Sequence, residues 1–255
     1  TDRYEYIMTY SFPCQDLSLA CRGKGMEKGS GTRSSLLWEV ERILLELKER
    51  NELPQVLVME NVPEVIGTKN YPHFMKWYSS LEQMGYQSYY KLLNAKDYGE
   101  PQSRNRCFMI SILGNYNYTF PSPVPLKRRL RDVLESELDE RYYLSDKATA
   151  YLFDDKDRGG MVRVKRVRLK NEDSTLANTV TTMQRGYSPF DNLIICDQRI
   201  RKLTPLECWR LMDYSDEDFY KAQAVNSNTQ LYKQAGNGIV RAVLMAVFKE
   251  MLGKE

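Results

Sequence analysis

The chain has 255 residues, of which 42% are hydrophobic, so it can bury a packed core and is not a disordered protein. The formal net charge of +3 is only mildly basic and does not by itself indicate a nucleic-acid partner. No apolar run approaches the ~20 residues of a membrane helix, and the N-terminal residues do not resemble a signal peptide. Five cysteines without a CxxC pair, beside one histidine, disfavour a disulfide framework and a metal site. We expect a soluble, intracellular protein with free thiols.

The first ~120 residues alternate strand-like with helix-like patterns, which predicts an α/β domain built on a parallel sheet. Apolar residues recur at helical spacing in two segments, 34–50 and about 73–84, and the second is expected to end at Gly85. The expected strands are residues 4–12, 55–60, 86–93 and 106–113.

Cys14 follows the first expected strand, directly after Pro13. Cysteine is among the residues most often buried, so a place in the core is one interpretation. A nucleophile is the other, but a Cys-His hydrolase would need a histidine base, and only His73 is available, within a helical pattern. Cys14 alone leaves both interpretations open.

Polar residues end or precede the neighbouring strands. Glu60 and Asn61 follow the second strand at the end where open α/β sheets bind ligands. A carboxylate there can have a raised pKa and donate a proton, or it can be a salt-bridged strand end. Arg104 and Arg106, two positions apart, are expected on one side of the chain, facing either the same site or the solvent.

The alternation of strand-like and helix-like patterns stops at Pro121, Pro123 and Pro125, which predict a domain boundary. Short β-like runs within 160–196 predict a small, strand-rich, basic module. Cations cluster in 127–131 and 158–170, where they can neutralise backbone phosphates or form a solvated face.

The chain is again helical from Thr204, where Thr-Pro-Leu-Glu combines an N-cap, a first-turn proline and a capping box. A second helix is expected to start at Ser215. The last helix is expected over about 238–252, directly after Gly236-Asn237-Gly238.

Five short segments follow one another along the chain in a specific order: Phe12-Pro13-Cys14-Gln15-x-x-Ser18, Glu60-Asn61-Val62, Gln102-x-Arg104-x-Arg106, Leu203-Thr204-Pro205-x-Glu207-Cys208 and Gly236-Asn237-Gly238. This order resembles the motifs of the C5-cytosine DNA methyltransferases. The resemblance covers nearly the whole chain except about 126–198, where this family has its variable target recognition domain.

The resemblance implies an α/β fold with a Rossmann-like, S-adenosylmethionine-dependent methyltransferase sheet that is N-terminally incomplete, plus a small β-rich target recognition domain. Residues 1–125 would form the catalytic domain, 126–203 the target recognition domain, and 204–255 a hinge and a C-terminal helix returning to the catalytic domain.

The implied activity is methyl transfer from S-adenosylmethionine to C5 of a flipped cytosine in a specific duplex DNA sequence. Cys14 would add to C6 as a thiolate, and Glu60 would donate a hydrogen bond to N3 or protonate it. Arg106, with Arg104 beside it, would steady the base and a neighbouring phosphate, and Asn61 would position the Glu60 loop.

The resemblance also implies binding residues. The cofactor contacts would be Pro13, Leu36, Gly236 and Asn237, and no metal is expected; Gly238 stands where the family motif usually has serine. The implied DNA contacts are Gln15, Ser18, Arg22, Lys24 and Arg33 from an active-site loop, and Arg163, Lys165 and Arg166 from the recognition domain.

The family's glycine-rich turn after its first strand, the acidic residue that binds the cofactor ribose, and the adenine segment are not found before Cys14. Three explanations compete: truncation, which we favour, a split enzyme completed by a second chain, or a gene remnant. We expect a monomer, or a chain completed by an N-terminal segment or a partner, in the cytoplasm of a bacterial or phage-infected cell. The rival functions are a tRNA cytosine-5 methyltransferase and a half-enzyme that needs a partner chain.

Overall fold

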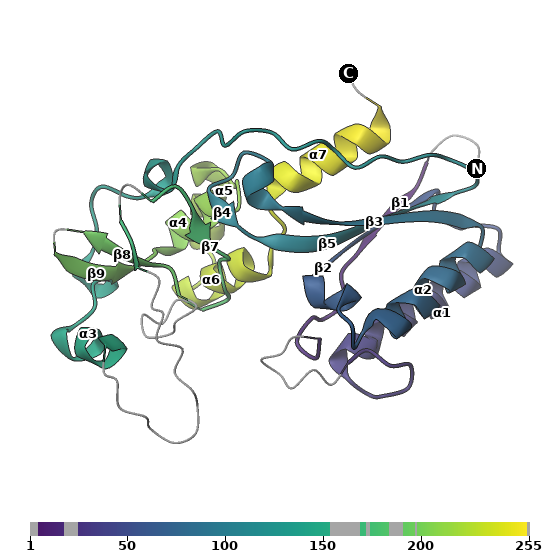
Figure 1. Cartoon of the computed structure of the whole chain (residues 1–255), viewed down its shortest axis with the longest axis horizontal. Coiled ribbons are helices and arrows are strands. Elements are labelled where there is room, and N and C mark those ends of the chain that lie inside the picture. Colours follow the sequence, from purple (N-terminus) through teal and green to yellow (C-terminus); the bar gives the residue numbers. More distant parts are fainter. Residues whose placement is uncertain are drawn as a thin grey trace. The chain divides into compact units, whose positions relative to one another are not determined.

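The computed structural model describes residues 5–17, 25–153, 169–171, 174–183, 191–196 and 198–253. Its residues form two compact units (Figure 1). The first comprises 1–93, 105–121 and 250–255, and the second comprises 94–104 and 122–249.

The first unit is built on a four-stranded sheet in the order β1-β2-β5-β3. The strands are β1 (Ile7–Tyr10), β2 (Val56–Asn61), β3 (Tyr86–Asn94) and β5 (Asn105–Leu113). β1 pairs with β2 in parallel, whereas β2 pairs with β5 in antiparallel orientation. The expectation of a parallel sheet is therefore wrong for β5, because alternation of strands and helices predicts element type and not the direction of every strand.

Helices α1 (Leu37–Glu49) and α2 (Tyr71–Gln83) lie side by side against this sheet (Figure 1). Short 3₁₀ turns, η2 (Arg33–Leu36) and η3 (Pro63–Ile66), precede them. Apolar side chains of both helices and of β2 form one core, which includes Leu44, Leu57, Met59, Trp77 and Leu81. Gly85 has a φ of 96°, which confirms the predicted end of α2, since glycine adopts this conformation readily.

The second unit contains two small sheets. β4 (Gln102–Ser103) pairs in parallel with β7 (Ala177–Asn178), and the other sheet has the order β6-β8-β9. The strands of that sheet are β6 (Leu169–Lys170), β8 (Leu193–Cys196) and β9 (Arg199–Lys202). The predicted strands around 162–168 lie outside the described residues, and the predicted recognition domain remains a prediction.

The helices of the second unit are α3 (Asp146–Phe153), α4 (Pro205–Leu211), α5 (Asp216–Gln223), α6 (Asn228–Asn237) and most of α7 (Arg241–Leu252); the shorter turns are η4 (Ala95–Asp97), η5 (Leu130–Val133) and η6 (Glu140–Tyr142). The capping box at the start of α4 and the cap of α5 by Ser215 are confirmed. The helices α3 and α6 were not predicted.

A buried ion pair fixes the start of α4. Both guanidinium Nη atoms of Arg201 lie 2.9 Å from carboxylate oxygens of Glu207, and both residues are almost fully buried. Glu207 also accepts a hydrogen bond from the Thr204 amide, so one carboxylate closes the capping box and compensates a buried cation.

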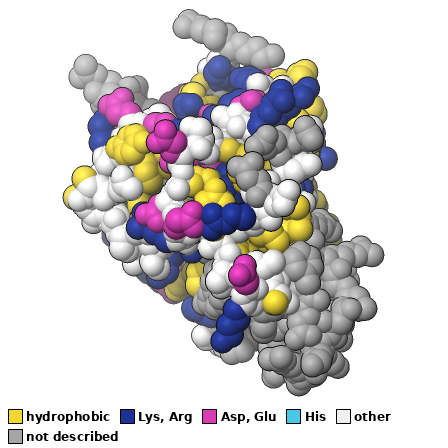
Figure 2. Space-filling view, turned by 90° about the vertical axis from the view of Figure 1, so that its left-hand side faces the viewer, with side chains coloured by type: hydrophobic (Ala, Val, Ile, Leu, Met, Phe, Trp, Pro, Cys, Tyr) yellow, Lys and Arg dark blue, Asp and Glu magenta, His cyan; other side chains and the backbone are white. Residues whose placement is uncertain are grey.

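The compact units agree only partly with the predicted division of the chain. The division at residues 121 and 122 lies close to the predicted boundary at 125, whereas 204–249 groups with 122–203. The functional assignment of the three predicted segments stays a prediction. In Figure 2, Lys and Arg side chains lie interspersed with acidic and hydrophobic ones on the described surface in view.

Candidate active site

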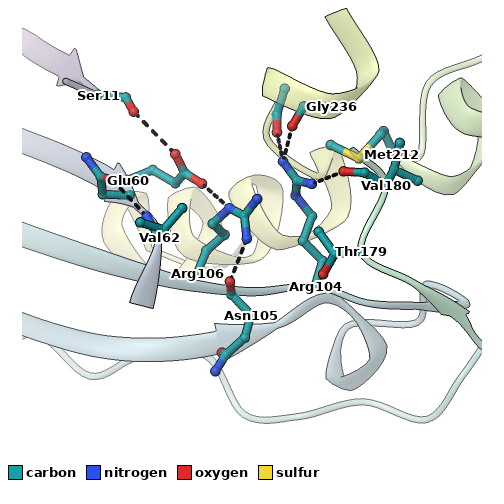
Figure 3. Close-up of polar contacts among 12 residues, drawn as sticks. Ser11, Glu60, Val62, Arg104, Asn105, Arg106, Thr179, Val180, Met212 and Gly236 are labelled. Carbon is teal, nitrogen blue, oxygen red and sulfur yellow. Dashed lines mark hydrogen bonds and ion pairs between the residues drawn. The ribbon is translucent and has the colours of Figure 1, made fainter. Parts of the chain in front are cut away.

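The register of β2 and β5 brings Glu60 and Arg106 together. Glu60 lies opposite Phe108, and side chains two residues apart share a face of a strand, so Arg106 projects on the same face as Glu60. Arg106 Nε lies 3.2 Å from Glu60 Oε1 (Figure 3). The two side chains are only 17% and 9% exposed, so the ion pair is largely shielded from bulk water.

The end of β1 places Ser11 beside the same carboxylate. Tyr10 pairs with Met59 in parallel register, so the next residues, Ser11 and Glu60, continue side by side. Ser11 Oγ donates to Glu60 Oε2 at 3.4 Å (Figure 3). Glu60 is thus contacted by residues that follow β1 and begin β5.

Cys14 lies in the segment after β1, three residues beyond Ser11. It has a half-buried free thiol and begins a turn in which Leu17 N donates to Cys14 O at 3.1 Å. Burial lowers the pKa of the Arg106 guanidinium, and the charges of Glu60, Cys14 and Glu64 oppose that shift. The Cys14 thiol therefore interacts electrostatically with the Arg106 guanidinium, and a shared catalytic role of Cys14, Glu60 and Arg106 stays a prediction.

Asn61 joins the end of β2 to the segment that carries Cys14. Its buried amide Nδ2 donates to Phe12 O at 3.0 Å, and its Oδ1 accepts from Val62 N at 2.8 Å. The carbonyl of Pro13 in turn accepts a hydrogen bond from Ser34 Oγ. Two hydrogen bonds thus hold the backbone immediately before Cys14, and the role of Asn61 in positioning the Glu60 loop stays a prediction.

The described thiols differ in their surroundings. Cys107 and Cys208 are fully buried. Burial raises the pKa of Cys107 to about 12, with a contribution from the Glu60 charge, and burial also raises the pKa of Cys208 well above its ordinary value. Both stay protonated at neutral pH and cannot act as thiolates. Cys14 and Cys196 are half-buried, and of these two Cys14 interacts electrostatically with Arg106.

Arg104 has different partners from Arg106. In the second unit its guanidinium donates to Val180 O at 2.9 Å and to Gly236 O and Gly238 O at 2.8 Å (Figure 3). The residue is only 3% exposed. The expected pairing of the two arginines is not what their contacts show, because backbone carbonyls take up the Arg104 donors. A substrate contact for Arg104 stays a prediction.

Gly236 is required by the packing of the chain itself. A Cβ atom there would lie 2.4 Å from Thr182 N and 2.5 Å from Thr181 C, closer than any real Cβ contact. Gly236 and Asn237 form the last residues of α6, and Asn237 is exposed. Of the other predicted cofactor contacts, Leu36 is 49% exposed and Pro13 is half-buried.

The predicted DNA contacts are only partly described. Gln15 is exposed, and the Arg33 side chain is 63% exposed. The remaining candidates, Ser18, Arg22, Lys24, Arg163, Lys165 and Arg166, lie outside the described residues. Within the described ranges, no cluster of His, Cys, Asp and Glu could hold a metal ion, and no helix is long and apolar enough to cross a membrane.

Three residues at the site have no role in the sequence interpretation: Ser11, Asp16 and Ser34. The signal for Ser11 was available, since parallel pairing of the first two strands places it beside Glu60. The contacts of Asp16 and Ser34 join segments about 20 residues apart, which strand and helix periodicity does not predict.

A model of the family described as C-5 cytosine-specific DNA methylase matches residues 5–253. The chain belongs to this family. The order of the motifs in the sequence agrees with that membership.

Curated relatives of this DNA methylase family include bacterial enzymes. The type II methyltransferase M2.ScrFI of Lactococcus lactis subsp. cremoris is 39% identical over 255 residues, which cover 96% of this chain and 66% of that protein. The orphan methyltransferase M.SssI of Spiroplasma monobiae is 44% identical over 140 residues, 55% of this chain and 36% of that protein. The chain thus spans less than two thirds of the length of these relatives.

The fold is also that of a solved methyltransferase structure. The S. pombe Dnmt2 methyltransferase superposes with a TM-score of 0.73 at 19% identity, covering 97% of this chain and 79% of that one. At 19% identity the similarity shows only that the two chains share a fold, a mixed α/β architecture. It does not identify the substrate of this chain.

Proposed function

We propose that the protein containing this chain transfers a methyl group to C5 of a flipped cytosine in a specific duplex DNA sequence. The observation that carries the proposal is the shielded Glu60–Arg106 ion pair at the ends of neighbouring strands. The half-buried thiol of Cys14, in the segment after β1, interacts electrostatically with its arginine. Membership of the cytosine-specific family gives this constellation its substrate.

The chemistry begins with the weak nucleophilicity of C5 in aromatic cytosine. The Cys14 thiolate adds to C6 while N3 gains a proton from Glu60, and the electron pair becomes available at C5. C5 would then take the methyl group as its bond to the sulfonium sulfur of S-adenosylmethionine breaks, and S-adenosylhomocysteine would leave. Loss of the C5 proton to a base and cleavage of the C6–S bond release 5-methylcytosine and the Cys14 thiolate, and the N3 proton returns to Glu60.

Arg106 and Ser11 orient the carboxylate for this task. Arg106 Nε contacts one oxygen of Glu60 and Ser11 Oγ the other, so both oxygens have a fixed direction before a base arrives. Preorganised groups of this kind need little rearrangement at the transition state. Asn61 and Ser34 hold the carbonyls of Phe12 and Pro13, which limits movement of Cys14.

S-adenosylmethionine, when bound, would supply the electrophilic methyl group. Leu36, with its half-exposed apolar side chain, and the half-buried Pro13 fit a contact with its adenosyl or methionyl part. Gly236 does not offer an open cradle, because the backbone of Thr181 and Thr182 fills the space beside its Cα atom. The exposed Asn237 can contribute polar atoms.

The proposal includes the finer assignments made from the sequence. The sheet of the first unit would be part of a Rossmann-like methyltransferase sheet, and 126–203 would read the DNA target. The exposed Arg33 and Gln15 would contact the DNA near Cys14. The reaction would take place in the cytoplasm of a bacterial or phage-infected cell.

Methyl transfer by the full natural protein tests the proposal. Isotope-labelled S-adenosylmethionine is mixed separately with duplex DNA and with tRNA, and label is expected in the DNA. Label in tRNA alone would replace this proposal by a tRNA cytosine-5 methyltransferase. No label in either would favour a half-enzyme, and addition of a partner chain would then be required for transfer.

Covalent trapping tests the nucleophile. Duplex DNA with 5-fluorocytosine at the target position should form a stable adduct in the presence of S-adenosylmethionine, because fluorine cannot leave C5 as a proton does. Cys14→Ala should form none, whereas Cys196→Ala, which removes the other half-buried described thiol, should retain it. An adduct with Cys14→Ala would show that another group attacks C6.

A further inference from the structure

Asp16 is a buried carboxylate two residues beyond Cys14, and the proposed reaction gives it no task. The residue is only 4% exposed. Burial of a carboxylate is costly unless hydrogen bonds or charges compensate it. Its Oδ2 accepts from Arg33 N at 2.8 Å and lies 3.6 Å from Arg33 Nε, so both the backbone and the side chain of Arg33 compensate the charge.

These contacts join Asp16 to the start of η2. Arg33 is the first residue of η2, where backbone N–H groups have no partner within the helix. Thr32, the residue in the N-cap position, makes no side-chain capping hydrogen bond. Asp16 therefore takes the place of the N-cap side chain from a distance of 17 residues.

The backbone of Asp16 makes a second connection. Its carbonyl accepts from Gly25 N at 2.9 Å, and the carbonyl of Gly25 accepts from Thr32 Oγ1 at 3.0 Å. Gly25 has a φ of 87°, a conformation that favours glycine. Asp16, Gly25, Thr32 and Arg33 thus form a closed set of contacts, which we call the Asp16 joint.

The segment that follows Gly25 is held against helix α1 by Met26 and Lys28. The indole nitrogen of Trp38 in α1 donates to Met26 O at 2.8 Å. Lys28 forms an ion pair with Glu41 of α1, and Glu41 also accepts from Ser80 of α2 at 2.8 Å. Since both helices pack in the core, the joint is a fixed point against which the turn 14–17 can be held.

We infer that Asp16 is a positioning residue for Cys14, which acts through its hydrogen bond to the Arg33 amide; this inference rests on the proposed function. Cys14 and Asp16 belong to one turn, closed by the bond from Leu17 N to Cys14 O. A nucleophile displaced by ~1 Å can lose about 10²-fold in rate, so fixing this turn bears directly on addition to C6.

The test measures the single-turnover rate of adduct formation with 5-fluorocytosine DNA at saturating DNA, and the DNA dissociation constant separately. Asp16→Ala should slow the adduct about 10²-fold with little change in DNA affinity. Asp16→Asn keeps an oxygen that accepts from the Arg33 amide, so it should recover most of the rate. Arg33→Ala keeps that amide and should weaken DNA binding more than it slows the saturated rate.

Each outcome decides the inference. Equal rates for Asp16→Ala and the parent protein overturn it while the proposed function stands, and so does an Asn variant as slow as Asp16→Ala. A parent protein that forms no adduct overturns both. Thermal unfolding checks the fold; if Asp16→Ala is unfolded, Asp16→Glu, lengthened by one methylene, should be folded and slower, and a folded Glu variant with the parent rate overturns the inference.

Discussion

Arg104 and Arg106 are two positions apart in the sequence, yet they serve two different regions of the molecule. Arg106 lies in the first unit and contacts the Glu60 carboxylate, which the proposed reaction uses. Arg104 lies in the second unit and donates to three backbone carbonyls. An arginine side chain therefore pairs with a carboxylate in one region and holds backbone carbonyls in the other.

The difference follows from the hydrogen-bond acceptors that lie near each guanidinium group. Arg106 meets a carboxylate whose other oxygen is contacted by Ser11, at a partly accessible position. Arg104 meets the carbonyls at the end of α6 and at Val180, which would otherwise lack these donors. We therefore expect loss of Arg106 to affect mainly catalysis and loss of Arg104 to affect mainly stability.

Glu60→Gln is expected to have the largest effect on the catalytic side of this comparison. The amide cannot donate a proton as the carboxyl does, so the rate of methyl transfer should fall by about 10²–10⁴-fold. The free energy of unfolding should change much less. Methyl transfer under single-turnover conditions measures the first effect, and thermal unfolding the second.

Glu64→Gln is the matched control. Glu64 also acts on the Arg106 guanidinium through its charge, as the last and smallest of the charges that raise the pKa of Arg106. Its rate should stay close to that of the parent protein. Equal losses for the Glu60 and Glu64 variants would mean that negative charge near Arg106, rather than the position of Glu60, supports the reaction.

Arg104→Met tests the structural side. Removal of the guanidinium leaves three carbonyls without their charged donor, which should lower the free energy of unfolding by about 3 kcal/mol. Arg106→Met, the matched variant, should lower it less and should lose methyl transfer. Chemical denaturation measures both proteins. An Arg104 variant of parent stability without activity would instead favour the predicted substrate contact.

Gly236→Ala tests the packing that Arg104 fastens. The new Cβ atom would meet the backbone of Thr181 and Thr182, so stability should fall by about 2 kcal/mol. Gly238→Ala is the control, because its nearest contact is 3.0 Å, to Gln234 O. Thermal unfolding should show the larger loss for Gly236. The reverse order would mean that the approach of 181–182 can relax.

Asp216→Asn removes the charge from a more exposed ion pair, Arg210–Asp216, and should change the free energy of unfolding least. Hydrogen bonds from Arg210 lower the pKa of Asp216 below its ordinary 3.8, and its side chain is 44% exposed. The pair should therefore contribute about 0.5 kcal/mol, fully present above pH ~4 and lost as the pH falls through the lowered pKa. Unfolding of both proteins at neutral and acidic pH should show a difference only at the former. A difference that persists in acid would point to another cause.

Several elements were predictable because their signals are local. The apolar periodicity of α1 and α2, the glycine after α2 and the capping box before α4 all act within a few residues. The antiparallel pairing of β2 with β5 was not predictable in this way, since strand direction depends on the partner. α6 was missed because Gly236 and Asn237 disfavour a helix locally, while the close approach of 181–182 requires glycine there.

The sequence by itself determined the family, through the order and spacing of its motifs. It also predicted one catalytic site of Cys14, Glu60, Arg104 and Arg106, of which the structure pairs Glu60 with Arg106. Tertiary structure alone decided that Arg104 would hold carbonyls and that Asp16 would reach Arg33. The physical reason is that the residue type determines the chemistry of a side chain. The hydrogen-bond or charge partner of a buried side chain depends instead on which distant segment of the chain packs beside it.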